Sequence, residues 1–131
     1  MCLGETKLKV RDMMIRKVTT AKKDTSIKEV FQILNECHVG SVVITDEKGK
    51  CRGIFTERDA IRMVATDVPL HTVLEEVMTT NIITIWEEAS YAEAKRLYRN
   101  HGIRHLPVVD KQNNLVGMLS IRSVIDEFIE L

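Results

Sequence analysis

The segment Gly53-Ile54-Phe55-Thr56-Glu57-Arg58-Asp59 decides the predicted fold, because a short apolar strand pattern passes directly into a helix that Thr56 can cap. The segment recurs 64 residues later as Gly117-Met118-Leu119-Ser120-Ile121-Arg122-Ser123. The whole chain aligns with itself at this offset without a gap, which is typical of an internal repeat. Identical pairs at this offset are Met14 and Met78, Thr20 and Thr84, Ser26 and Ser90, Glu29 and Glu93, Asp46 and Asp110, Gly53 and Gly117, Arg58 and Arg122, and Ile61 and Ile125.

The first copy of the unit has the pattern β-α-β-β-α. Ser26 and Glu29 form a capping-box sequence that opens a helix, and Asp46 to Gly49 form a turn between two β-branched runs. The last helix of this copy is expected to begin after Thr56, to end near Ala65, and to place Ile61 and Val64 on its inner side. The expected elements are strand 18–20, a helix from residue 27, strand 41–45, strand 51–55 and helix 57–65.

The second copy repeats this order after a linker at residues 66–72 that contains Pro69. Its expected elements are strand 82–85, a helix from Ser90 to about residue 100, strand 106–109, a turn at 111–114, strand 115–119 and a final helix. A lone unit has helices for one face of its sheet and none for the other. We therefore predict an α+β fold of two tandem β-α-β-β-α repeats, packed sheet to sheet with approximate two-fold symmetry, with residues 1–66 as the first domain and 67–131 as the second.

Composition and charge exclude several classes of protein. The 131 residues contain 19 Lys plus Arg and 19 Asp plus Glu, so no overall field favours nucleic acid or an anionic membrane. The three cysteines, Cys2, Cys37 and Cys51, have no metal-site spacing, and their odd number favours a reducing compartment. The sequence has no signal-peptide pattern and no run approaching the ~20 apolar residues of a membrane span. We expect a soluble cytoplasmic protein.

Two segments carry a resemblance to a known family. Gly102-Ile103-Arg104-His105-Leu106-Pro107-Val108-Val109-Asp110 and residues 53–59, set in tandem repeats, together resemble the CBS-domain pair, or Bateman module, from about Val10 to the end. The resemblance implies a stand-alone regulatory module that catalyses nothing. It also implies binding of AMP, ADP or ATP, less often S-adenosylmethionine or NADH, in clefts between paired repeats, and action on a separate partner protein.

The same resemblance implies a main nucleotide cleft around Thr56 and Asp59. The carboxylate of Asp59 would accept hydrogen bonds from both ribose hydroxyls, Thr56 would reach phosphate, and the free N–H groups of the following helix would favour phosphate too. Branched aliphatic residues would enclose adenine while Arg104 and His105 face the phosphates. The alternative for Thr56 and Asp59 is a capping box that needs no ligand. The alternative for Arg104 and His105 is a pair of solvated loop residues. The implied residues are Ile54, Thr56, Asp59, Thr79, Ile82, Ile83, Ile103, Arg104 and His105.

A second cleft departs from the family pattern. Ser120 matches the threonine, but Ser123 stands in the place of the aspartate, and the loop opposite offers Gly40 and Ser41 in place of Arg104 and His105. We therefore expect this cleft to be weaker or empty. Its implied residues are Ile15, Thr19, Val39, Gly40, Ser41, Met118, Ser120 and Ser123.

Other sequence features carry less weight, and rival functions stay open. His101 and His105 do not share a helical face, which disfavours zinc binding, and adjacent Cys37 and His38 form no catalytic dyad. The rivals are a ligand-free dimerisation and docking scaffold and a nucleic-acid binder, the latter disfavoured by charge. We predict a homodimer, because the helices carry more apolar surface than one internal pairing can bury; the residues concerned are Val30, Leu34, Ile61, Leu97, Ile125 and Phe128.

Overall fold

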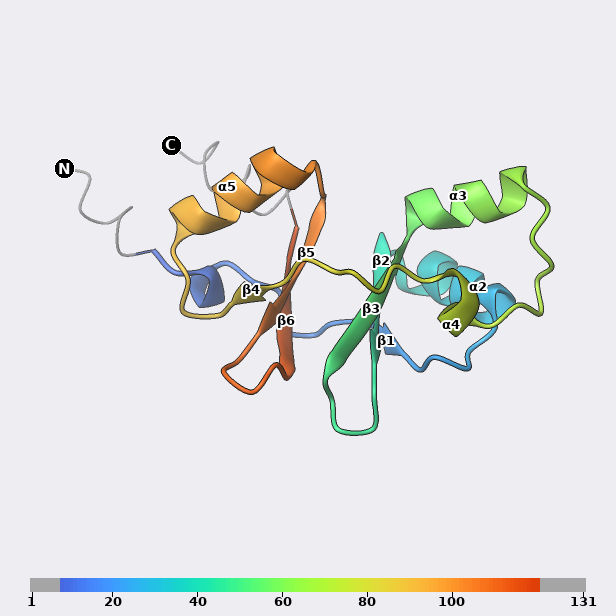
Figure 1. Ribbon diagram of the computed structural model, residues 1–131, viewed down its shortest axis with the longest axis horizontal. Coiled ribbons are helices and arrows are strands. Elements are labelled where there is room, and N and C mark those ends of the chain that lie inside the picture. Colours follow the sequence, from blue (N-terminus) through green and yellow to red (C-terminus); the bar gives the residue numbers. More distant parts are fainter. Residues whose placement is uncertain (1–7, 121–131) are drawn as a thin grey trace. The chain divides into compact units, whose positions relative to one another are not determined.

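The computed structural model describes residues 8–120, which form two compact units (Figure 1). Unit 2 runs from Thr19 to Ile82, and unit 1 combines the chain before Thr19 with the chain after Ile82. Unit 2 contains β1 (Thr20–Ala21), α2 (Ile27–Cys37), β2 (Ser41–Thr45), β3 (Cys51–Thr56), α3 (Glu57–Ala65) and α4 (Leu74–Val77). Unit 1 contains η1 (Val10–Asp12), β4 (Ile85–Trp86), α5 (Tyr91–His101), β5 (His105–Val109) and β6 (Leu115–Ser120). The predicted α+β class is confirmed.

Each unit is built on a three-stranded sheet with the same topology. In unit 2 the order is β1-β2-β3, with β1 parallel and β3 antiparallel to β2. In unit 1 the order is β4-β5-β6, with β4 parallel and β6 antiparallel to β5. The antiparallel register sets Ser41 opposite Thr56 and His105 opposite Ser120. The residue that begins the middle strand therefore lies beside the residue that ends the last strand.

The capping sequences begin the helices where the sequence predicts. The Ser26 hydroxyl accepts a hydrogen bond from the Glu29 backbone N–H at 3.2 Å, and Ser90 accepts one from Glu93 at the same distance. The helices α2 and α5 end at residues in the left-handed conformation, His38 at φ 53° and Gly102 at φ 60°. A cap of this kind satisfies a terminal carbonyl, which fixes where each chain segment turns back toward its sheet.

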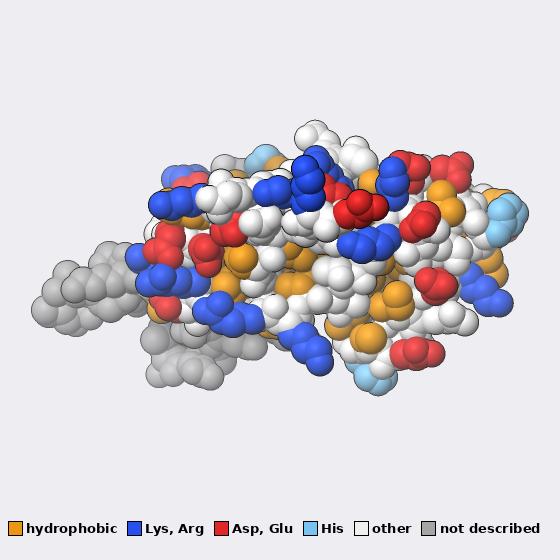
Figure 2. Space-filling view, turned by 90° about the horizontal axis from the view of Figure 1, so that it is seen from below, with side chains coloured by type: hydrophobic (Ala, Val, Ile, Leu, Met, Phe, Trp, Pro, Cys, Tyr) orange, Lys and Arg blue, Asp and Glu red, His pale blue; other side chains and the backbone are white. Residues whose placement is uncertain are grey.

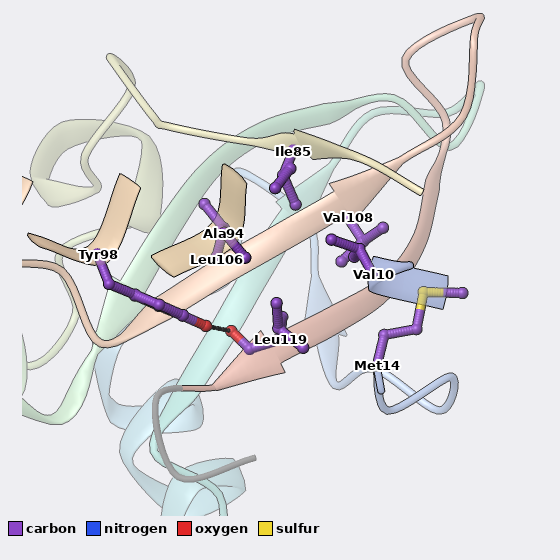
Figure 3. Packing of buried hydrophobic residues seen from close by; sticks show 8 residues of the cluster. All are labelled: Val10, Met14, Ile85, Ala94, Tyr98, Leu106, Val108 and Leu119. Atoms are coloured by element: carbon purple, nitrogen blue, oxygen red, sulfur yellow. Dashed lines mark hydrogen bonds between the residues drawn. The ribbon is translucent and has the colours of Figure 1, made fainter. Parts of the chain in front are cut away.

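Each unit has its own apolar core on one face of its sheet. In unit 2, α2, α3 and α4 pack on the sheet face that carries Phe55; the core is Ile27, Val30, Leu34, Val42, Ile44, Phe55, Met63 and Leu74. In unit 1 the core is Val10, Met14, Ile85, Ala94, Tyr98, Leu106, Val108 and Leu119 (Figure 3). The buried Tyr98 hydroxyl donates to the Leu119 carbonyl at 2.5 Å, so its polar end is satisfied inside the core. Burial also raises the pKa of Tyr98 well above its usual range.

A segment from outside the three strands pairs with the last strand of each sheet. Thr79 and Ile54 exchange two backbone hydrogen bonds of 3.1 Å, and Ile15 and Met118 exchange two of 2.8 Å. Residues 8–18 therefore belong with the second sheet in packing, although they precede the first sheet in sequence. The sequence repeat and the packing units divide the chain differently.

Glycine allows this close pairing. A Cβ atom at Gly53 would lie 2.8 Å from the Met78 sulfur and 3.0 Å from the Thr79 carbonyl oxygen. A Cβ atom at Gly117 would lie 2.5 Å from the Met14 sulfur. Gly53 and Gly117 are equivalent in the two repeats, and so are Met78 and Met14. Each glycine therefore lies close to the methionine of its own unit, and the same contact occurs twice.

The structure corrects the predicted positions of the two short parallel strands. The strand expected at 18–20 is β1 at Thr20–Ala21, and the one expected at 82–85 is β4 at Ile85–Trp86. Both strands have two residues, and their positions are set by pairing with the middle strand, which a β-branched run alone does not specify. The short η1 and α4 were not predicted. The expected final helix lies outside the described residues.

The predicted inner face of α3 is wrong. Ile61 and Val64 are 71% and 66% exposed, whereas Asp59 and Met63 are buried. Met63 enters the core. Because the helix has 3.6 residues per turn, Ile61, two residues before it, and Val64, one residue after it, point in other directions. Val30 and Leu34, expected on a dimer face, are instead buried in the unit 2 core, and Leu97 packs against the unit 1 core. Ile125 and Phe128 lie outside the described residues.

Candidate functional site

The candidate site is the junction of β3 and α3 in unit 2. Thr56 has extended backbone angles of φ −117° and ψ 170° and is the N-cap of α3. The Thr56 side chain accepts a hydrogen bond from the Asp59 backbone N–H at 3.4 Å, and Asp59 Oδ2 accepts one from the Thr56 N–H at 2.9 Å. This reciprocal pair is a capping box, the arrangement that the sequence offered as the alternative to a ligand site.

The Asp59 carboxylate is buried and has three protein donors. Its Oδ2 atom also accepts from the Thr56 hydroxyl at 3.2 Å, and its Oδ1 atom lies 3.0 Å from Arg62 Nη2. The residue is 8% exposed, whereas the Arg62 side chain is 53% exposed. Arg62 was not among the residues predicted for the site. Its position three residues after Asp59 on a predicted helix was the available signal, because such residues are neighbours on a helix surface.

The expected free donors at the start of α3 are largely engaged. The Glu57 N–H donates to the Gly40 carbonyl at 3.0 Å, and the Asp59 N–H donates to Thr56 Oγ1. The expectation that these amides are free to bind phosphate is therefore wrong for Glu57 and Asp59. The partial positive charge of the helix start remains, but a phosphate here would depend more on side chains.

Unit 2 contains five of the residues expected in the main cleft. Thr79 pairs with Ile54 on β3, which leads directly to Thr56 and Asp59, and Ile82 ends the unit. Thr79 is exposed, and Ile54 and Ile82 are half-buried. Gly40 and Ser41, which were expected in the other cleft, lie beside Thr56 in this unit.

The other four expected residues of the main cleft belong to unit 1. Ile83 and Ile103 pack partly buried against the unit 1 core. Arg104 is exposed just before β5, and His105 begins that strand opposite Ser120.

The residues expected in the weaker cleft are also divided between the units. Ile15, Met118 and Ser120 belong to unit 1, where Ile15 is 52% exposed and Met118 is buried. Thr19, Val39, Gly40 and Ser41 belong to unit 2. The Thr19 carbonyl accepts from the Val43 N–H at 3.0 Å, and Val39 packs against the unit 2 core. Ser123 lies outside the described residues.

Among the described residues are two surface pockets, one in each unit, and neither is lined by a residue expected in the clefts. The first, of about 790 Å³, includes Lys22, Lys23 and Lys48; the second, of about 540 Å³, includes Trp86, Glu87 and Gln112. These residues correspond at the repeat offset, so the fold forms the same hollow twice, next to the turn after the middle strand. In unit 2 that turn lies at the opposite end of β3 from Thr56.

The turn beside the unit 2 pocket is held by Asp46. Backbone N–H groups of Lys50 and Lys48 and the Arg52 side chain donate to its carboxylate, and they hold its pKa below the usual value. Asp110 accepts from the Gln112 and Asn114 N–H groups in the corresponding turn of unit 1. These carboxylates organise turns, and acidic and basic residues balance along the larger pocket.

The surface charge of the described residues is mixed. On the face shown in Figure 2, acidic and basic side chains alternate over the described part of the chain without a continuous basic stripe. Within residues 8–120, no group of three or more His, Cys, Asp or Glu residues is placed to hold a metal ion. The helices of the same residues are too short or too polar to cross a membrane.

Comparison with known proteins identifies the family. The family model of the CBS domain matches residues 10–66 and again residues 74–130. The chain therefore belongs to the CBS domain family and contains two CBS domains. It is 34% identical over 113 residues to the CBS domain-containing protein YhcV of Bacillus subtilis, covering 86% of this chain and 79% of that protein.

A solved structure and an enzyme extend the comparison. The CBS domain pair of protein MJ0100, in complex with 5′-methylthioadenosine and S-adenosyl-L-methionine, superposes with a TM-score of 0.86 at 29% identity, covering 93% of this chain and 96% of that one. Inosine-5′-monophosphate dehydrogenase of Aquifex aeolicus is 32% identical over 112 residues. This match covers 86% of the present chain but 23% of the enzyme, so most of the enzyme has no counterpart in it.

Proposed function

We propose that this CBS-domain pair is a regulatory module that binds an adenosine-containing ligand at Thr56 and Asp59, with AMP, ADP and ATP as the expected ligands. The observation that carries the proposal is the buried Asp59 carboxylate, held beside the Thr56 hydroxyl at the start of α3. An ionised carboxylate can accept hydrogen bonds from both hydroxyls of a ribose. The adenosine-containing ligands of the similar MJ0100 pair support an adenosine moiety.

The remaining residues keep the roles that the family resemblance implies. The branched aliphatic residues Ile54, Ile82, Ile83 and Ile103 would contact adenine through their apolar side chains. Arg104 and His105 would interact with phosphate. Arg104→Ala tests this assignment, because a phosphate-binding arginine affects AMP affinity much more than adenosine affinity.

Calorimetric titration of the full chain tests the proposal. The ligands are AMP, ADP, ATP, S-adenosylmethionine, 5′-methylthioadenosine and NADH. Asp59→Asn keeps the shape of the side chain and removes the charge, and Glu93→Gln makes the same change at the corresponding position of α5. We expect adenine-nucleotide binding by the parent and by Glu93→Gln, and at least a roughly tenfold loss in Asp59→Asn. Absence of binding by all six ligands would overturn the proposal.

A second function, a ligand-free dimerisation scaffold, is favoured by the apolar surface of α3. Ile61 and Val64 lie one turn apart on this helix and are both exposed. A scaffold of this kind would be dimeric and would release no heat with any adenosine compound. A regulatory module would bind the ligand, and its hydrogen-exchange protection would change beyond α3, because regulation requires that the ligand favours one state of the protein.

A further inference from the structure

The acceptor capacity of Asp59 is the starting point for a further inference, which rests on the proposed function. A carboxylate offers about four lone-pair sites, two on each oxygen. Oδ2 already accepts from the Thr56 N–H and the Thr56 hydroxyl, and Oδ1 lies 3.0 Å from Arg62 Nη2. A ribose that presents two hydroxyl donors therefore displaces the Thr56 hydroxyl, the Arg62 guanidinium or both.

Arg62 is the donor that moves at low cost. Its side chain is 53% exposed, so water can solvate the released guanidinium, and a ribose hydroxyl takes its place as donor to the buried Asp59 carboxylate. The Thr56 N–H, in contrast, is fixed by the backbone at the end of β3. When Arg62 leaves Oδ1, its guanidinium stays within one helical turn of the ligand-binding carboxylate and has five N–H donors to offer.

A phosphate bound at this position would need a cationic side chain as a partner. The N–H groups of Glu57 and Asp59 are already bonded to Gly40 and Thr56, so they give a phosphate little to bind. A guanidinium can pair with two phosphate oxygens at once. A ligand without an anionic group at the ribose 5′ position offers the displaced arginine no such partner.

We propose that Arg62 is the specificity-determining residue of this site and makes it prefer adenosine ligands with a 5′-phosphate over those with an uncharged or cationic 5′ group. The second repeat has no arginine at the equivalent position, because the residue 64 positions later is Asp126. AMP and 5′-methylthioadenosine form the most direct comparison, since they share adenine and both ribose hydroxyls and differ in charge at the 5′ position.

The test measures both affinities by calorimetry for the parent and for Arg62→Ala, Arg62→Gln, Arg58→Ala and Arg96→Ala. Arg96 is a matched control, because it forms an ion pair with Glu93 at the corresponding positions of α5. We expect the parent to bind AMP more tightly than 5′-methylthioadenosine. Both Arg62 variants should lose about tenfold or more in AMP affinity, while 5′-methylthioadenosine affinity stays the same or rises by up to about threefold. Arg96→Ala should match the parent.

The outcomes separate this inference from the proposed function. If neither compound binds the parent, both ideas fail. If the parent prefers 5′-methylthioadenosine, or if the Arg62 variants change both affinities alike or neither, the specificity role of Arg62 is wrong and the site itself stands. An AMP loss in Arg58→Ala that equals the loss in Arg62→Ala would likewise overturn it, because general positive charge near the start of α3 would then explain the preference.

Discussion

Thr56 and Asp59 stabilise each other across the first turn of α3, the Thr56 N–H donating to Asp59 Oδ2 at 2.9 Å and the Asp59 N–H to Thr56 Oγ1 at 3.4 Å. Asp59 therefore has a structural part as well as its proposed binding part. Asp59→Ala should weaken adenine-nucleotide binding by about 1.5–3 kcal/mol, the range for hydrogen bonds to charged groups. The cap predicts an additional cost of about 1 kcal/mol to folding.

Urea unfolding and titration of the same samples separate the two effects. Asp59→Asn retains an acceptor for the Thr56 N–H, so it should recover most of the stability and little of the affinity. If Asp59→Ala bound nucleotide as well as the parent, the ribose role would be excluded and the carboxylate would be a cap alone.

Gly53→Ala should destabilise the protein by about 1–3 kcal/mol, the usual range for overpacking. The added methyl group would meet the Met78 sulfur at 2.8 Å and the Thr79 carbonyl oxygen at 3.0 Å, at the pairing of Thr79 with Ile54. The measurement is the urea midpoint. Adding Met78→Ala should recover only part of the loss, because the backbone carbonyl cannot be removed. An unchanged midpoint in Gly53→Ala would contradict this account of the repeated glycine.

The exposed apolar face of α3 leads to a prediction about assembly. Ile61 and Val64 are 71% and 66% exposed, and such a face is typically covered by another surface. We expect a homodimer by light scattering at micromolar concentration and a shift toward monomer in Ile61→Glu/Val64→Glu. The control, Lys28→Glu on α2, should remain dimeric. A monomeric parent, or a double variant that stays dimeric, would contradict this prediction.

The burial of Cys51 should affect its reactivity and the way in which the stability of the protein varies with pH. Burial raises the pKa of the Cys51 thiol to about 11, while Cys37 is exposed. Folding favours the protonated thiol, so its contribution is complete below about pH 9 and is lost as pH rises toward 11. The free energy of unfolding should therefore fall more steeply across this interval in the parent than in Cys51→Ala.

Peptide mapping after alkylation at pH 8 should find Cys37 modified and Cys51 protected; rapid labelling of Cys51 would contradict its burial.

The sequence predicts the parts of the fold that local chemistry determines. The helix starts at Ser26 and Ser90 can be predicted because each capping hydrogen bond joins residues that are three positions apart. The two-residue strands β1 and β4 were misplaced because their register depends on the partner strand. The exposed position of Ile61 was missed because the apolar character of a residue does not determine which face of its helix packs against the core.

The candidate site shows the same division. The positions of Thr56 and Asp59 at a strand-to-helix junction follow from the sequence, and the capping alternative was visible there too. Engagement of the Glu57 N–H by the Gly40 carbonyl was not foreseeable, because it depends on the β2–β3 register. Such long-range pairings decide which donors stay available to a ligand.

The two repeats should differ in affinity, with the site at Thr56 and Asp59 filled first and the one at Ser120 and Ser123 weakly or not at all. A serine at 123 offers a neutral hydroxyl where the ribose diol needs an anionic acceptor. Losing that carboxylate, and with it the Arg104–His105 pair implied for the stronger site, should cost several kcal/mol, roughly a hundredfold or more in affinity. Ser123→Asp should strengthen the weaker site in a calorimetric titration, while Ser123→Asn, which adds bulk without charge, should not. Two equivalent sites in the parent, or a nucleotide bound at Ser120 in a protein whose Asp59 site is empty, would show that the carboxylate does not control the difference.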